Sequence, residues 1–229
     1  MKNVIAAASL LALSLAGARA ADLPRRDAAP AFPGPGFSSA PAFSWTGFYA
    51  GVNGGFATGG FTRGGDALFG KANGGLIGGT LGYNHQFNTV VLGVEGDWGW
   101  SGIKGSNNAL AGPAFASSRI TSLATARLRA GYSIDRALLF VTGGYAGGSV
   151  RSTLTDTSLP PGAQTFNSRS WNNGFALGAG VEYAFTKNIS AKLEYLHVGL
   201  ADKPVFAPPR AFTSGARQNI VRAGLNYRF

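Results

Sequence analysis

Four segments of this chain close with an apolar residue, a small or polar residue and a tyrosine, and these tyrosines are Tyr83, Tyr132, Tyr183 and Tyr227. Successive copies stand roughly 45 to 50 residues apart, which leaves room for two membrane-spanning strands of about ten residues each and their connections. Two residues after the last copy the sequence reaches Phe229. The repeat predicts an all-β chain that folds as an eight-stranded antiparallel up-and-down transmembrane β-barrel.

The N-terminal residues have the pattern of an export signal. Lys2 supplies a positive charge, an apolar stretch too short to cross a bilayer follows, and residues 18–20 form an A-x-A cleavage site. We therefore expect residues 1–20 to be a Sec signal peptide that is removed. Residues 21–46 are rich in Pro and Ala and are expected to be a periplasmic linker, and residues 47–229 are expected to form the barrel in the outer membrane.

Alternating apolar and polar residues mark eight expected strands. These strands cover residues 48–56, 75–87, 90–100, 118–132, 137–149, 174–185, 189–198 and 220–229. Short turns are expected at 88–89, 133–136 and 186–188, and long loops rich in Gly, Ser and Pro at 57–74, 101–117, 150–173 and 199–218. Outer-membrane barrels keep their termini and short turns in the periplasm. The long segments are therefore expected to face outward from the cell.

The alternation also assigns the two faces of most strands. In residues 220–229 the apolar residues share one parity, whereas Arg222 and Arg228 share the other. The apolar face of each strand is expected to meet lipid and the polar face to point into the barrel. Residues 137–149 are apolar at both parities, so their orientation stays open.

Charged residues on the inward parities are the main candidate site. The interior of an eight-stranded barrel is just wide enough for side chains, so acids and bases should pair across it. The predicted ion network contains Glu95, Asp97, Arg127, Arg129, Glu182, Lys192, Glu194 and Arg222. Such a network either fills and rigidifies the barrel or gates a narrow ion path, and the sequence leaves both interpretations open.

Aromatic residues near the strand ends are the second group of candidates. Tyrosine and tryptophan favour the two membrane interfaces of a barrel, because one end of the side chain is apolar and the other is polar. The expected interface residues are Tyr83, Trp98, Trp100, Tyr132, Tyr183 and Tyr227. The alternating segment that ends with Tyr227 and Phe229 also resembles the assembly signal read by the outer-membrane insertion machinery, which we expect to be a partner.

Several of these segments together resemble a known family. The segments are residues 45–51 (WTGFYAG), 78–83 (GGTLGY), 94–97 (VEGD), 126–132 (ARLRAGY) and 221–229 (VRAGLNYRF). They are similar to the small outer-membrane β-barrel proteins of alphaproteobacteria, the opacity-like porin and surface-antigen group of rhizobia and brucellae. The resemblance implies an abundant envelope protein, and it allows a porin, a haem-binding or a host-interacting role.

Composition and residue types argue against other functions. The chain has no cysteine and only two histidines, His85 and His197, which lie near opposite ends of the expected barrel. We therefore predict no catalytic residues, no metal site and no cofactor, and no enzymatic activity. The net charge of +10 comes without a nucleic-acid-binding signature, so anionic lipopolysaccharide and outer-membrane lipids are the expected partners rather than nucleic acid.

The sequence thus favours an integral outer-membrane protein with a structural, envelope-integrity and surface-exposed role, whose interior is plugged by the ion network. Two alternatives stay open. One is a low-conductance porin, and the other is an adhesin or a receptor that binds haem or a host ligand through its loops. The oligomeric state is not predicted.

Overall fold

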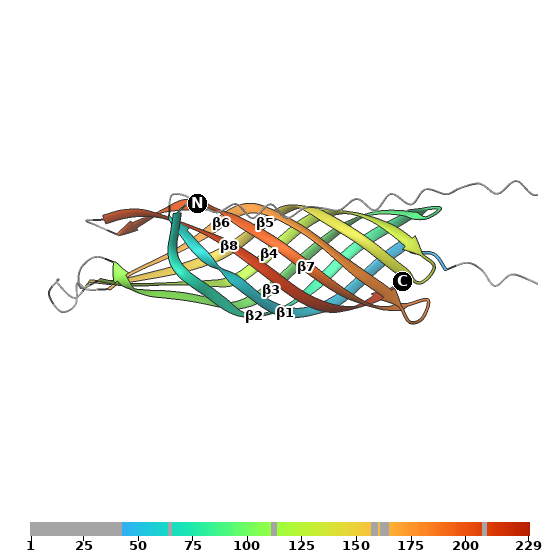
Figure 1. The fold of residues 1–229 in the computed structure, drawn as a ribbon, viewed down its shortest axis with the longest axis horizontal. Coiled ribbons are helices and arrows are strands. Elements are labelled where there is room, and N and C mark those ends of the chain that lie inside the picture. The colour runs from blue at the N-terminus through green and yellow to red at the C-terminus, as the bar shows by residue number, and fades with distance from the viewer. Residues whose placement is uncertain (1–42, 64–65, 111–113, 157–159, 161–164, 208–209) are drawn as a thin grey trace, which may run out of the picture. The chain divides into compact units, whose positions relative to one another are not determined.

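The computed structural model describes residues 43–63, 66–110, 114–156, 160, 165–207 and 210–229. Eight antiparallel strands form a closed barrel in which each strand pairs with its sequence neighbours and β1 pairs with β8 (Figure 1). The strands are β1 (Gly47–Arg63), β2 (Asp66–Phe87), β3 (Val90–Leu110), β4 (Ala114–Ile134), β5 (Ala137–Asp156), β6 (Thr165–Ala184), β7 (Ile189–Ala207) and β8 (Arg210–Arg228). The predicted fold class is confirmed. The predicted signal peptide and nearly all of the predicted linker lie outside the described residues.

Short connections join the strands at one end of the barrel. The β2–β3 and β4–β5 turns each have two residues, and Asn88 and Asp135 in these turns have φ values of 55° and 51°. Asn and Asp tolerate this left-handed conformation better than most residues, which makes tight hairpins possible here. The short connections were predicted at 88–89, 133–136 and 186–188, and the structure has them at 88–89, 135–136 and 185–188, the second being shorter because β4 continues to Ile134. We call the end with these turns and the C-terminal end of β8 the turn end, and the opposite end the far end.

The strands are longer than the sequence predicted. They contain 17 to 22 residues, whereas about 9–11 residues cross a bilayer. The segments expected to be long loops are largely strand, so that prediction was wrong. The predicted strands end where the outward residues are no longer apolar. Strand pairing continues beyond that point, because the backbone hydrogen bonds between strands do not depend on apolar side chains. No helix in the described part of the chain is long and apolar enough to cross a membrane.

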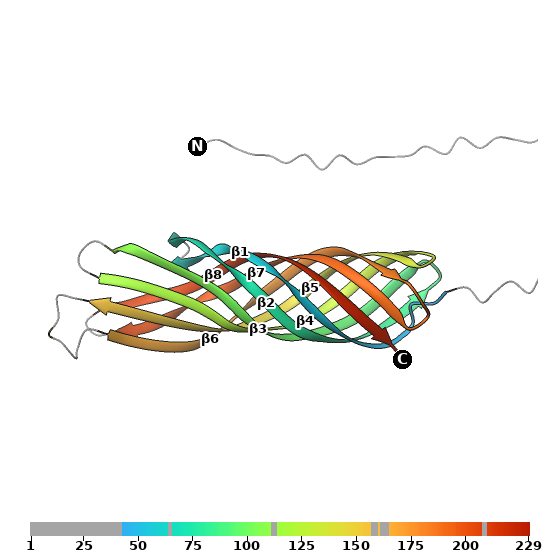
Figure 2. The same cartoon turned by 90° about the horizontal axis from the view of Figure 1, so that it is seen from below.

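The outer wall has an apolar band between two aromatic bands. Aliphatic side chains such as Leu81, Leu128 and Leu225 are exposed to the surroundings of the barrel. Aromatic residues flank them toward the turn end at Phe48, Tyr83, Tyr132, Tyr183 and Tyr227, and toward the far end at Trp98, Trp100, Tyr145, Trp171 and Phe175. The six predicted interface aromatics thus lie at the two edges of this apolar band. Figure 2 shows the tilt of the strands that form the wall. This arrangement is typical of a membrane-spanning barrel.

Inside the barrel, apolar layers lie on both sides of the charged residues. Along β3, the inward side chains are first Val91, then Glu95 and Asp97, and then Ile103. The turn-end layer consists of Trp45, Val91, Leu138, Phe140 and Ala184, with Phe43 packed against it. The far-end layer receives residues from all eight strands: Ala57, Phe61, Ala72, Leu76, Ile103, Ile120, Leu123, Ala146, Val150, Ala176, Leu196, Val198, Leu200, Ala216 and Ile220.

The turn-end layer depends on a residue that precedes the first strand. Trp45 is completely buried. Its backbone NH donates to Oε1 of Gln86 over 2.7 Å, and its Nε1 donates to the carbonyl of Asp135 over 3.3 Å. The guanidinium of Arg228 lies 4.5 Å from the centre of the Trp45 ring. The layer also explains the orientation of β5, which the sequence left open, because Leu138 and Phe140 turn inward to join it.

Candidate functional site: the charged interior

Arg127 on β4 lies at the centre of the charged interior. Its guanidinium pairs with three carboxylates: with Glu194 over 2.5 Å, with Asp97 over 2.6 Å and with Glu95. The same side chain donates to Oγ1 of Thr142 over 2.8 Å. The pairing register explains the first of these contacts, since Glu95 on β3 stands directly opposite Arg127. A planar guanidinium with five donors can hold several carboxylates at once, which an ammonium group does less well.

Two cations from the opposite wall complete this cluster. Arg222 on β8 pairs with Glu194 over 2.6 Å and with Asp97 over 3.0 Å. Lys192 on β7 pairs with Glu95 over 2.7 Å. The Arg222–Asp97 and Lys192–Glu95 contacts cross the lumen and tie β3 to β8 and β7, as the Arg127–Glu194 contact ties β4 to β7. The network therefore braces the barrel against flattening.

A second cluster lies between this centre and the turn end. Arg129 pairs with Glu182, whose Oε1 also accepts hydrogen bonds from Ser190 over 2.5 Å and from Asn226 over 2.9 Å. The Arg129 guanidinium is stacked 3.8 Å from the centre of the Phe140 ring. Phe140 belongs to the turn-end layer, so the cation–π contact joins the ion network to that layer.

The structure brings all eight predicted charged residues together, and their charges balance. Four carboxylates face four cations, and every one of the eight is buried. Burying a charge in a medium of low dielectric costs several kcal/mol unless partners compensate it. Here each carboxylate has at least one cationic partner within 3.0 Å. Loss of one partner is therefore expected to be far more costly than loss of a pair.

The sequence missed the neutral members of the network. Tyr49 donates its hydroxyl to Oε2 of Glu95 over 2.8 Å, and Thr80 and Thr125 donate to the two oxygens of Asp97 over 2.7 and 2.8 Å. These residues lie at the same inward parity as the charged residues, and this parity is the sequence feature that could have identified them. Their polar groups occupy the lone pairs that the cations leave unfilled, so they complete the solvation of the carboxylates.

Gly82 makes room for one of these neutral members. A Cβ atom at this position would lie 2.3 Å from Cζ of the buried Tyr49 ring. We expect Gly82→Ala to displace the Tyr49 hydroxyl from Glu95 and to lower the free energy of unfolding by about 1–3 kcal/mol, as overpacking does in other cores. Gly96→Ala is the matched control, because a Cβ there has no neighbour closer than 3.8 Å. Urea unfolding in detergent measures both variants, and equal effects would show that Gly82 has no special role.

The two histidines lie on the outer wall rather than at this site. His85 is exposed and its ring is packed 4.4 Å from that of Phe87, while Nδ1 of His197 lies 2.8 Å from Oδ1 of Asn219. In the described part of the chain, no group of three His, Cys, Asp or Glu residues could hold a metal ion. The charged interior is thus a set of mutually neutralised ion pairs between two apolar layers.

Comparison with known proteins agrees with this architecture. The family model described as "Outer membrane protein beta-barrel domain" matches residues 7–229. The chain belongs to this family. It is therefore an integral outer-membrane β-barrel, as the resemblance in its motifs predicted.

Individual relatives extend the comparison. The chain is 35% identical over 248 residues to the 31 kDa outer-membrane immunogenic protein of Brucella melitensis, with all of both chains covered. It is 32% identical to the 22 kDa outer membrane protein of Rhizobium leguminosarum bv. viciae, covering 82% of this chain and 80% of the relative. Among solved structures, Neisserial surface protein A has 16% identity and a TM-score of 0.48, over 80% of this chain and 98% of the other.

Proposed function

We propose that this outer-membrane barrel is a structural, surface-exposed envelope component with a closed interior. The observation that carries the proposal is the layered lumen, in which a neutral ion network lies between the turn-end and far-end layers. A conducting pore needs a continuous hydrated path, and an apolar constriction excludes water as well as ions. The layered interior thus supports the structural role over a low-conductance porin.

The proposal also includes an orientation and a route of assembly. We place the turn end in the periplasm and the far end outside the cell, as in other outer-membrane barrels. The aromatic bands would then lie at the two membrane interfaces. Tyr227 and Phe229 would be presented to the insertion machinery, and the exposed Phe229 ring, which packs 5.3 Å from Tyr227, supports this role. No enzymatic activity is part of the proposal.

The extended far end supports the surface-exposed part of the role. Strand pairing continues there through segments such as 57–62 and 150–156, so the barrel projects a structured rim beyond its aromatic band. The Brucella relatives are named immunogenic outer-membrane proteins, and we propose that this rim is the part of the present protein that antibodies would meet. Ligand binding at the rim is the second candidate function.

The chain has no native cysteine, so single cysteines can test the orientation without background. Pro160 is exposed at the far end and Lys187 is exposed in a turn at the turn end. In intact cells, a membrane-impermeant maleimide should label Pro160→Cys, whereas Lys187→Cys should react only after the outer membrane is permeabilised. Both variants should sediment with the outer membrane and migrate faster on gels before heating than after. The reverse labelling pattern, or recovery in the soluble fraction, would contradict the proposed function.

A further inference from the structure

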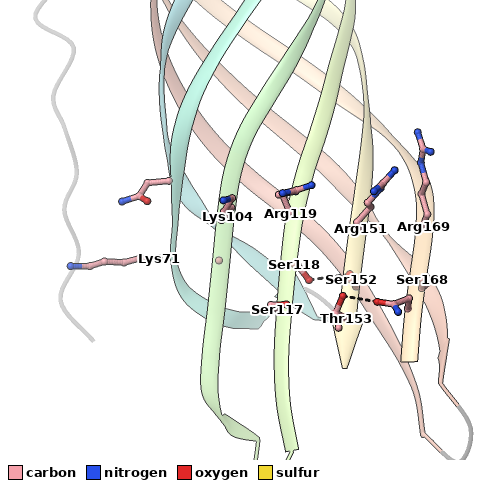
Figure 3. Close-up of a pocket in the computed structure, with 13 residues that line it drawn as sticks. Lys71, Lys104, Ser117, Ser118, Arg119, Arg151, Ser152, Thr153, Ser168 and Arg169 are labelled. Atoms are coloured by element: carbon pink, nitrogen blue, oxygen red, sulfur yellow. Dashed lines mark hydrogen bonds between the residues drawn. The ribbon is translucent and has the colours of Figure 1, made fainter. Parts of the chain in front are cut away.

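Four cations stand side by side on the outer wall near the far end. The pairing register places Lys104 on β3 opposite Arg119 on β4, Arg119 opposite Arg151 on β5, and Arg151 opposite Arg169 on β6. All four side chains are exposed, and the inward neighbours Ile103, Ile120 and Val150 are buried in the far-end layer. Figure 3 shows the four side chains at one level across the four strands. We call them the cation row.

The row lacks the compensation that the interior charges have. None of the ion pairs found among the described residues includes a member of the row. Within the described part of the chain, Arg169 is the one member of the row whose side chain donates a hydrogen bond, and that bond goes to Oγ of Ser149 over 3.1 Å. Like charges directly opposite each other on adjacent strands destabilise a sheet. Three such pairs in succession are therefore expected to need an anion from outside the chain.

The height of the row on the barrel identifies where that anion would come from. Arg169 lies two residues beyond Trp171 on the same face of β6, and Lys104 lies four residues beyond Trp100 on β3. Both tryptophans belong to the aromatic band toward the far end, where an aromatic girdle marks the edge of the hydrocarbon. Along a strand, two residues span roughly 7 Å. The row is thus placed at the level of the lipid headgroups of the outer leaflet.

Neutral polar groups stand just beyond the row. Ser117, Thr153 and Asn167 share its outward parity, one pleat closer to the far end, and Oγ1 of Thr153 donates to Oδ1 of Asn167 over 2.8 Å. All three line one open hollow together with the row, and the described residues that border this hollow lie on β2 to β6. A local site with cations at one level and hydroxyl and amide groups at the next matches a headgroup that carries both phosphate and sugar.

From these observations we propose that the cation row binds the phosphate groups of an outer-leaflet glycolipid, lipopolysaccharide, with Ser117, Thr153 and Asn167 facing its sugars. The inference rests on the proposed outer-membrane orientation, because only then does the row meet the outer leaflet. It assigns lipid binding to the wall of the barrel rather than to its connecting loops. Guanidinium groups suit phosphate through paired, charge-assisted hydrogen bonds, and clusters of basic residues at the membrane surface recognise anionic lipids.

The test uses the refolded full chain in detergent and purified lipopolysaccharide as the probe. The variant is Arg119→Gln/Arg151→Gln, which removes the two central cations of the row. The control is Arg136→Gln/Lys187→Gln, which removes the same charge from two exposed residues at the turn end. We expect the row variant to bind lipopolysaccharide at least tenfold more weakly than wild type, while the control stays within twofold. Equal losses in the two variants, or no loss in the row variant, would overturn the proposal.

Two further arms separate the possible sources of the anion. Inorganic phosphate and phosphatidylglycerol micelles should each bind at least tenfold more weakly than lipopolysaccharide, and equal binding of either probe would overturn the assignment to a glycolipid. Without lipid, the thermal midpoint of the row variant should equal or exceed that of wild type, because like charges have been removed. A lower midpoint would instead show that the row stabilises the barrel itself. Heat-dependent gel migration and cysteine labelling test the proposed function separately from this site. If both give the expected results while lipopolysaccharide binding does not depend on the cation row, only the proposed lipid site is wrong.

Discussion

Replacing Arg127 with alanine should lower the free energy of unfolding by about 3–5 kcal/mol. The side chain is fully buried and holds Glu95, Asp97 and Glu194 together. Its removal leaves four carboxylates in the lumen with three cations to neutralise them. The far-end layer keeps out the water that could replace the lost hydrogen-bond donors. Urea unfolding of the refolded protein, followed by tryptophan fluorescence and gel migration, measures the effect.

Two comparisons show whether the loss comes from the buried network. Arg136→Ala removes an exposed guanidinium from a turn and should change stability by less than about 1 kcal/mol. Adding Asp97→Asn to Arg127→Ala should recover part of the loss, because it removes one of the carboxylates left without a partner. A loss no larger than that of Arg136→Ala would mean that water already solvates the charges, which is incompatible with a dry interior.

Opening the lumen to ions should require changes in two layers at once. Arg127→Ala alone leaves the far-end layer intact, and Phe61→Ser/Leu196→Ser alone leaves the ion network intact, so neither variant is expected to conduct steadily. The combined variant should form stable channels in planar bilayers. These channels should favour cations, because four carboxylates would then face three basic residues in the lumen.

The gel migration assay provides the control for this experiment, since all three variants must be folded before their conductance is compared. Steady conductance of Arg127→Ala alone would show that the far-end layer does not seal the barrel. Steady conductance of Phe61→Ser/Leu196→Ser alone would show that the ion network does not block it. In either case the two-layer account of closure would be wrong.

The barrel and its charged centre could be predicted because both follow from strict alternation. Each of the eight charged residues lies within a strand whose outward neighbours are apolar, so parity alone placed them inside. The same rule placed Tyr183 and Trp100 on the outer wall. These inferences need only the period of a strand and the narrow bore of an eight-stranded barrel.

The far-end layer could not be predicted in this way. Phe61, Ile103 and Val150 lie in segments expected to be loops, because their outward neighbours are no longer apolar once the strands leave the hydrocarbon. The orientation of Leu138 and Phe140 was also open, since both faces of β5 are apolar there. Their inward position depends on Trp45 filling the turn end, a long-range contact that no local pattern reveals. The cation row needed the pairing register, because its members are not neighbours in the sequence. The paired residues are 32 positions apart for Arg119 and Arg151, and 15 and 18 positions apart for the other two pairs.

Single-channel recording of the wild-type protein tests the closed interior most directly. Protein that is refolded, shown by its gel migration to be folded and inserted into planar bilayers should give no steady conductance above the bare membrane. The ion network and the two apolar layers would then block the lumen together. Stable, ohmic channels that are unchanged in Arg127→Ala would contradict this account and would favour the porin alternative.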